Sequence, residues 1–106
     1  MEIFDLTPKI NMDDEIVQFY QSKDAVLLDV RTIEEYSEGH IVNSLNIPLN
    51  ELSTIETHIK DKKTMIFVHC LSGGRTTKAV RVLNAIGYTN IVNAGGLNSY
   101  TGEVVT

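Results

Sequence analysis

The chain has 106 residues, of which 42% are hydrophobic, and a formal net charge of −5 from 14 acidic and 9 basic residues. This length fits one small domain spanning residues 1–106, and the acidic balance, with no basic run beyond residues 60–63, argues against a nucleic-acid-binding surface. No stretch of 18 apolar residues is present to cross a membrane, and the single cysteine, Cys70, excludes an internal disulfide and a multi-cysteine metal site.

The first ten residues, MEIFDLTPKI, carry acidic side chains where a signal peptide has a basic stretch followed by an apolar one. We therefore expect a cytoplasmic protein. The alternative is the bacterial periplasm, with a signal peptide already removed. Neither a membrane nor a nucleic acid is expected as a partner.

Residues 2–28 contain two strand candidates around one helix. The short apolar segment 2–4 is the first candidate, and the continuous apolar run 25–28 has the pattern of a strand covered on both faces. Between them, with Asn11 as the helix cap, three residues share one helical face: Ile16, Phe19 and Tyr20.

Residues 32–59 predict a short helix, a short strand and a second amphipathic helix. Thr32 and Glu35 stand three residues apart, as in a capping box, and so mark the start of the short helix. Residues 44–47 are the strand candidate. The second helix is indicated by a stripe of apolar residues: Leu52, Ile55 and Ile59.

The second half of the chain again alternates strand candidates with an amphipathic helix. Residues 65–68 form a continuous apolar run, residues 91–92 a shorter one, and Gly87 is expected to close the intervening helix in a left-handed conformation. The clearest helical stripe of the chain lies in that helix: Ala79, Val82, Leu83 and Ile86. We therefore predict an α/β fold, with a central, mostly parallel sheet of about five strands flanked by helices. The alternative is an α+β sheet in which segment 2–4 is an antiparallel edge.

Cys70 directly follows the strand candidate 65–68 and precedes the helix that begins near Thr76. In an open parallel sheet, ligands bind beyond the carboxyl ends of the strands, which is where this cysteine falls. Two glycines, Gly73 and Gly74, allow the intervening loop to turn its backbone N–H groups inward, forming a nest for an anion. Arg75 adds a permanent cation with a fork of donors.

The same donors act on the sulfur. A thiol at a helix N-terminus beside an arginine has a lowered pKa, so Cys70 is expected to be a thiolate nucleophile near neutral pH. We predict Cys70 as the catalytic residue and the rest of the loop as the substrate-binding set: Leu71, Ser72, Gly73, Gly74, Arg75 and Thr76. The simpler alternative is a buried cysteine with only a packing role.

The loop Cys70–Leu71–Ser72–Gly73–Gly74–Arg75 resembles the active-site loop of the rhodanese (sulfurtransferase) family, Cys-x-x-Gly-x-Arg. Further segments are similar to that family's motifs: Leu28–Asp29–Val30–Arg31, Glu34–Glu35–Tyr36, Gly39–His40–Ile41, Asn46–Ile47–Pro48, Gly87–Tyr88–Thr89–Asn90–Ile91–Val92 and Ala94–Gly95–Gly96–Leu97. The ending is similar to that of single-domain bacterial members of the phage-shock type. The departures are mild: Thr76 and Thr77 replace the commoner serine start, and Tyr100 stands where many members carry tryptophan.

The resemblance implies a sulfurtransferase that needs neither metal nor organic cofactor. The Cys70 thiolate would take the outer sulfur of a small anionic donor such as thiosulfate, become a persulfide, and pass that sulfur to cyanide or to a thiol, which a protein can supply. Two alternatives stay open: a persulfide carrier with little thiosulfate turnover, and a regulatory binding module on the same scaffold. A tyrosine-phosphatase-like function is disfavoured. The active-site loop of those phosphatases has five residues between the cysteine and the arginine, whereas this chain has four between Cys70 and Arg75.

Other polar residues have structural explanations at least as good as catalytic ones. Asp29 and Arg31 end a strand candidate beside the loop, with Glu34 and Glu35 as candidate partners for Arg31 and a structural ion pair as the alternative. His69 adjoins Cys70, but strand alternation turns its side chain to the opposite face. A hydrogen-bonded structural role is expected for His40 and a solvated position for His58.

Overall fold

The computed structural model describes residues 10–106, so the strand candidate at residues 2–4 lies outside the described residues. The helices are α1 (Met12–Gln21), α2 (Ile33–Glu38), α3 (Ile55–His58) and α4 (Gly74–Ile86), with two 3-10 segments, η1 (Leu49–Thr54) and η2 (Leu97–Ser99). The strands are β1 (Val26–Asp29), β2 (Leu45–Asn46), β3 (Ile66–Cys70) and β4 (Ile91–Gly96).

The strands of the described residues form one parallel sheet in the order β2-β1-β3-β4. The predicted α/β fold with a parallel sheet is confirmed, but the sheet has four strands where about five were expected. The segment counted as the fifth, residues 2–4, lies outside the described part of the chain. β4 is longer than its apolar pair 91–92 suggested, because it continues past an irregularity opposite Val68 and His69 to reach Gly96.

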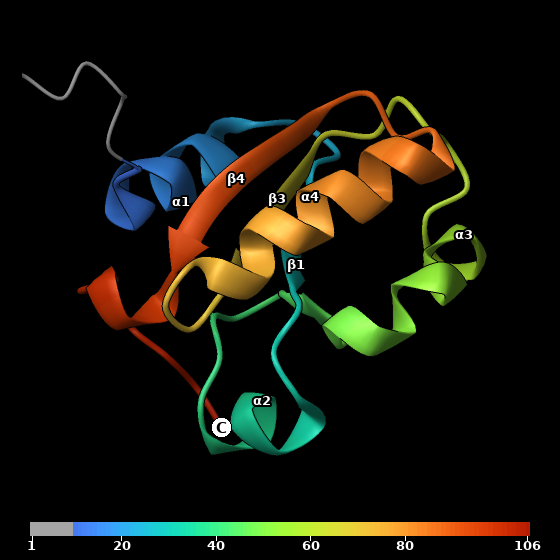
Figure 1. Cartoon of the computed structure of the whole chain (residues 1–106). Helices are drawn as coiled ribbons and strands as arrows, with labels where there is room; N and C mark the ends of the chain where they lie inside the picture. The colour runs from blue at the N-terminus through green and yellow to red at the C-terminus, as the bar shows by residue number, and fades with distance from the viewer. Residues whose placement is uncertain (1–9) are drawn as a thin grey trace, which may run out of the picture.

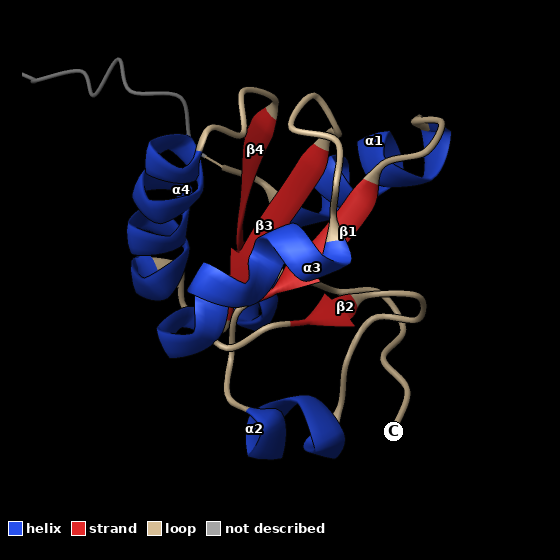
Figure 2. Ribbon diagram, turned by 90° about the vertical axis from the view of Figure 1, so that its right-hand side faces the viewer, coloured by secondary structure: helices blue, strands red, loops and turns tan. Residues whose placement is uncertain are grey.

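Helices cover both faces of the sheet (Figures 1 and 2). α4, η1 and α3 pack on one face, where the buried cluster includes Leu52, Ile55 and Leu83. α1 covers the other face, where Met12 and Ile16 meet Phe67 and its neighbours. β3 is central and buried along its whole length, which explains its continuous apolar pattern.

Three of the predicted helix ends are confirmed, whereas α4 begins at Gly74, two residues before Thr76, where the sequence placed its start. The Asn11 side chain accepts a hydrogen bond from the backbone N–H of Asp14, at 3.3 Å, and so caps α1. Thr32 and Glu35 form the reciprocal capping box of α2. Gly87 ends α4 with a φ of 115°, a left-handed conformation that glycine adopts without steric cost.

The expected helix through residues 52–59 is wrong in its form. Its apolar stripe is buried as predicted, but the backbone is a 3-10 segment followed by a four-residue α-helix. The hydroxyl groups of Thr54 and Thr57 donate to backbone carbonyls three residues earlier in the chain, at 2.8 and 2.7 Å. Such local side-chain bonds compete with regular helical geometry.

The segments that matter for a reaction gather at the carboxyl end of the sheet. α2 and the C-terminal segment lie beyond the ends of the strands, close to the loop that joins β3 to α4 (Figure 1). His40 and Val105 exchange two backbone hydrogen bonds, which hold the C-terminal segment against the end of α2. Within residues 10–106, no helix has the length and apolar character needed to span a membrane.

Candidate functional site

The candidate nucleophile sits at a tight junction between a strand and a helix. Cys70 is the last residue of β3 and is fully buried, and α4 begins four residues later at Gly74. Gly73 precedes the helix with a φ of 103°, which a residue with a side chain adopts only with strain. This glycine therefore lets the chain reverse over the sulfur within so short a loop.

Backbone N–H groups converge on the sulfur. Gly73 donates to the Cys70 Sγ at 3.0 Å. Burial by itself raises the pKa of Cys70, but hydrogen bonds from the Thr76 hydroxyl and from the N–H groups of Thr76, Gly73 and Arg75 outweigh it, so the pKa lies below that of an ordinary thiol. These N–H groups can bond to the sulfur because the first N–H groups of a helix have no carbonyl partners within the helix.

The Thr76 hydroxyl has one proton and two acceptors within reach. In the structure it donates to the Gly95 carbonyl at 3.0 Å, while Cys70 lies beside it. Rotation of the hydroxyl toward an ionised sulfur exchanges one acceptor for the other. Thr76 is completely buried, so water does not compete with these acceptors for its hydroxyl.

Gly96 sets the position of the loop from the neighbouring strand. A Cβ atom on this residue would lie 2.5 Å from the Leu71 carbonyl oxygen and 2.8 Å from the Ser72 carbonyl carbon, both of them backbone atoms. The Leu71 carbonyl also accepts a hydrogen bond from the Asn98 N–H at 2.9 Å. The first half of the loop thus rests directly on the end of β4, at a place where only glycine leaves room.

The second half of the loop is held by α2. The Arg75 guanidinium makes a bidentate pair with the Glu35 carboxylate, at 2.5 and 2.9 Å. Hydrogen bonding from Arg75 lowers the pKa of Glu35 to about 2, against an opposing effect of burial and with a further bond from the Thr32 N–H. The predicted cation of the loop is therefore present, and its charge is compensated within the chain.

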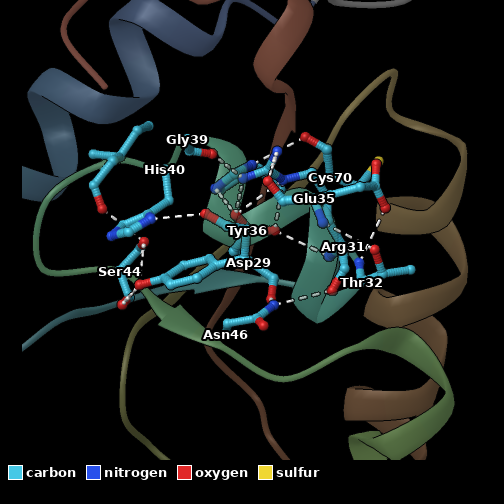
Figure 3. Close-up of polar contacts among 12 residues, drawn as sticks. Asp29, Arg31, Thr32, Glu35, Tyr36, Gly39, His40, Ser44, Asn46 and Cys70 are labelled. Atoms are coloured by element: carbon cyan, nitrogen blue, oxygen red, sulfur yellow. Dashed lines mark hydrogen bonds and ion pairs between the residues drawn. The ribbon is translucent and has the colours of Figure 1, made fainter. Parts of the chain in front are cut away.

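A second ion pair joins Asp29 and Arg31 (Figure 3). Asp29 is completely buried and accepts hydrogen bonds from Nε and one terminal nitrogen of Arg31, the shortest at 2.7 Å. Arg31 also donates to the backbone carbonyl of Gly39 at 2.8 Å. Arg31 thus pairs with Asp29 and reaches only the backbone of Glu35, not its carboxylate, which corrects the partners expected from the sequence.

The histidines take no direct part in the cysteine site. The His69 ring bonds to the Cys70 carbonyl at 3.0 Å and lies 3.6 Å from the Asp29 carboxylate, on the side away from the sulfur. Burial lowers the pKa of His69, so the ring is neutral. His40 stacks on Tyr36 at 3.8 Å and bonds to its carbonyl, and His58 is exposed. Among residues 10–106, no group of three or more potential ligand side chains could hold a metal ion.

The six predicted substrate-binding residues lie in the loop and the first turn of α4, and three of them donate hydrogen bonds to the Cys70 sulfur: Gly73, Arg75 and Thr76. Leu71 and Ser72 are exposed on the outside of the loop, and Thr76 is buried beneath it. Sequence reasoning gave Glu35 a capping role and a candidate pairing with Arg31, and did not identify its contact with Arg75. It treated Gly96 as part of a motif, without the reason for a glycine there. The sequence carries no local signal for either contact, since both join segments that are distant along the chain.

Comparison with known proteins places this geometry in a defined family. The profile of the rhodanese-like domain matches residues 12–103. A solved structure of an Escherichia coli rhodanese with anions superposes with a TM-score of 0.71 at 35% identity, covering 76% of this chain and 96% of that chain.

Two curated relatives are similar over most of this chain. The thiosulfate sulfurtransferase PspE of Escherichia coli is 39% identical over 71 residues, 66% of this chain and 68% of that protein. The adenylyltransferase and sulfurtransferase uba4 of Ogataea parapolymorpha is 44% identical over 79 residues, 74% of this chain but only 20% of that protein. The chain thus spans about a fifth of the longer relative.

We predict that Thr76→Val raises the pKa of Cys70 by about one pH unit, since a hydrogen bond to a charged group is worth about 1.5–3 kcal/mol. Thr76→Ser keeps the hydroxyl and should stay close to the parent protein. The measurement is a pH titration of the thiolate absorbance in the ultraviolet, with Cys70→Ser as the blank. Equal pKa values in the valine and serine variants would contradict a role for the hydroxyl.

We also predict that Gly96→Ala displaces the loop. The added methyl group has no room against the Leu71 and Ser72 backbone, and such overpacking costs about 1–3 kcal/mol. Thermal unfolding should show the loss, and the pKa of Cys70 should rise as the Gly73 N–H moves from the sulfur. Gly39→Ala is the matched control, because its Cβ would meet Val104 at an ordinary 3.6 Å. A Gly96→Ala protein with parental stability and thiol pKa would refute this explanation.

Proposed function

Because the chain belongs to the rhodanese-like domain family of sulfurtransferases, we propose that it moves sulfane sulfur through a persulfide on Cys70. The observation that carries the proposal is the convergence of N–H donors on a buried sulfur whose pKa is lowered. A thiolate held in this way is a nucleophile, and the same donors stabilise the negative charge of a persulfide on it.

The donor half-reaction follows from the chemistry of an activated thiolate. The Cys70 sulfur attacks the outer sulfur of thiosulfate or a similar donor, the sulfur–sulfur bond of the donor breaks, and sulfite leaves with the bonding electrons. Cys70 then carries the persulfide. The name of the similar protein PspE, a thiosulfate sulfurtransferase, supports this donor.

In the second half-reaction a thiolate or cyanide attacks the outer sulfur of the persulfide. The sulfur–sulfur bond on Cys70 breaks, and Cys70 leaves as the thiolate that began the cycle. Neither half-reaction requires a metal or an organic cofactor, because both are displacements at sulfur.

The loop residues divide these tasks by position. The backbone N–H groups of Gly73, Arg75 and Thr76 hold the sulfur, and the Thr76 hydroxyl assists them. Leu71, Ser72 and Gly74 are exposed and form the outer wall that a reactant meets. Four residues between Cys70 and Arg75 make a cradle that fits one extra sulfur atom better than a phosphate group.

A persulfide carrier is the second candidate, and the Arg75–Glu35 pair favours it. Thiosulfate is a dianion, yet the guanidinium nearest to Cys70 is already bound to a carboxylate on both of its terminal nitrogens. A carrier loaded by another persulfide needs no free cation for its donor. Weak turnover with thiosulfate, combined with ready loading from a persulfide, would identify this function.

The central test is to form the persulfide and detect it. After incubation with thiosulfate, intact-mass spectrometry should show the gain of one sulfur atom, and cyanide should remove it. Cys70→Ser should gain nothing, while its circular dichroism stays that of the parent protein. A gain of sulfur that persists in Cys70→Ser, or the absence of any adduct with thiosulfate and with a persulfide donor, would overturn the proposed function.

The ion pair decides how thiosulfate binds. Glu35→Gln removes a negative charge and releases Arg75, so we expect the KM for thiosulfate to fall by about fivefold, the effect of one charge on a dianion at ~8 Å in water. Arg75→Ala should raise the KM. Glutamine still serves in a capping box, which protects α2. If both variants raise the KM equally, the pair acts only as a scaffold for the loop.

A further inference from the structure

The charges at the carboxyl end of the sheet do not suit a small anion as the only partner. Its two arginines are both paired within the chain, Arg31 with Asp29 and Arg75 with Glu35. Three exposed carboxylates remain around the same edge, on α2 and η1: Glu34, Glu38 and Glu51. In residues 10–106, neither ion-pair nor hydrogen-bond partners are found for these three side chains.

The positive charges of the described residues lie mostly elsewhere. Lys23 precedes β1, and the lysines of residues 60–63 precede β3, which places them at the amino end of the parallel sheet. Lys78 and Arg81 lie on the exposed side of α4, with Lys78 one turn beyond Arg75. Asp24, Glu56 and Asp61 offset most of the positive charge at the amino end, so the net negative charge of the described residues lies toward the cysteine loop.

Exposed apolar side chains lie among these carboxylates. Ile33 on α2 is 60% exposed, Leu71 beside the cysteine 42%, and Val104 in the C-terminal segment 46%. We call the combined surface the acidic face; it consists of Glu34, Glu38, Glu51, Ile33, Leu71 and Val104. Exposed apolar groups surrounded by polar ones are typical of a protein-binding surface.

Three hollows of about 200, 290 and 220 Å³ follow one another across this face. The first lies between Ile33 and Glu51, the second reaches Arg75, and the third joins Glu38, Leu71 and Val104. The loop therefore has a hollow at each end, beside Leu71 and beside Arg75. One hollow offers room for a small thiol, and the three together offer room for a protein segment.

We propose that the acidic face docks a protein that presents its accepting cysteine among lysine or arginine side chains. The proposal rests on the proposed function and adds the class of acceptor. The partner's thiolate attacks the outer sulfur of the Cys70 persulfide, the sulfur–sulfur bond on Cys70 breaks, and Cys70 leaves as a thiolate. The partner departs as a persulfide, with no net oxidation or reduction.

The physical basis is charge complementarity, which mainly accelerates encounter and selects partners. In water, one charge acting on another at roughly 8 Å changes a rate slightly more than twofold, so two carboxylates together contribute about fivefold. Added salt weakens the effect, because exposed charges are screened beyond about 10 Å at 0.1 M ionic strength.

The test begins with the Cys70 persulfide already formed and checked by its removal with cyanide. Its discharge is then timed with two short peptides that carry one cysteine, flanked by lysines in one and by glutamates in the other. Rates are divided by the measured thiolate concentration, since neighbouring charges also shift the pKa of the peptide thiol. The lysine peptide should react several times faster, and the difference should shrink with added salt.

Two charge-matched variants locate the effect. Glu34→Gln with Glu38→Gln should reduce the preference for the lysine peptide at least about fivefold, since the lysine peptide slows while the glutamate peptide speeds up, and should not slow discharge by the cyanide anion. Asp24→Asn with Glu56→Gln removes the same charge from exposed positions in the turn before β1 and in α3, and should keep the preference. Circular dichroism and thermal unfolding confirm that both variants are folded.

The possible results test the acidic face, the docking of a protein and the persulfide chemistry separately. Equal corrected rates for the two peptides, or an equal loss of preference in both variants, would overturn the acidic face while the persulfide chemistry stands. Cysteamine reacting as fast as the lysine peptide would show that a small cationic thiol suffices, and would overturn docking of a protein. Failure to form any persulfide on Cys70 would remove the proposed function itself.

Discussion

The convergence of backbone N–H groups on the Cys70 sulfur is the interaction on which the rest of the site depends. β3 is buried and central, so it fixes Cys70, and α4 begins within four residues of it. The first turn of a helix always needs acceptors for its free N–H groups. Here the sulfur is one of those acceptors, and an ionised sulfur in a buried position needs donors just as much. The free N–H groups of α4 need acceptors, and the Cys70 thiolate needs donors. The same hydrogen bonds satisfy both, so they stabilise the fold and lower the thiol pKa together.

α2 extends this constraint to the charge of the site. The capping box fixes Glu35 at the start of the helix, and the same carboxylate receives both terminal nitrogens of Arg75. Beneath it, Asp29 neutralises Arg31. Because both arginines are compensated internally, the field that an approaching reactant meets is set by the exposed glutamates of α2 and η1. The positive charge in the loop motif therefore does not by itself define an anion-binding surface.

The parts of this arrangement that are local in sequence could be predicted. The strand-cysteine-glycine-arginine order placed the loop, and the caps at Asn11, Thr32 and Gly87 have their expected geometry. The contacts that hold the loop could not be predicted, because they depend on which segments are neighbours in space. Glu35 meets Arg75 across 40 positions of the chain, and Gly96 meets Leu71 only once β4 is paired with β3 in its irregular register. The 3-10 backbone of η1 was missed for another reason, since apolar spacing does not distinguish it from an α-helix.

Chemistry and selectivity lie on different elements of this molecule. The β3–α4 junction offers the same hydrogen bonds to any sulfur placed on Cys70, so it cannot select an acceptor. The chain has one cysteine, so a persulfide there has no second thiol in its own chain to discharge it. Release then depends on what can approach a buried sulfur across α2, η1 and the C-terminal segment. The exposed side chains of these elements can vary as long as their buried contacts, such as Leu52 in the core and the Glu35–Arg75 pair, are kept. Under the proposed function, the surface around the loop would therefore select the partner, while the loop would carry out the reaction.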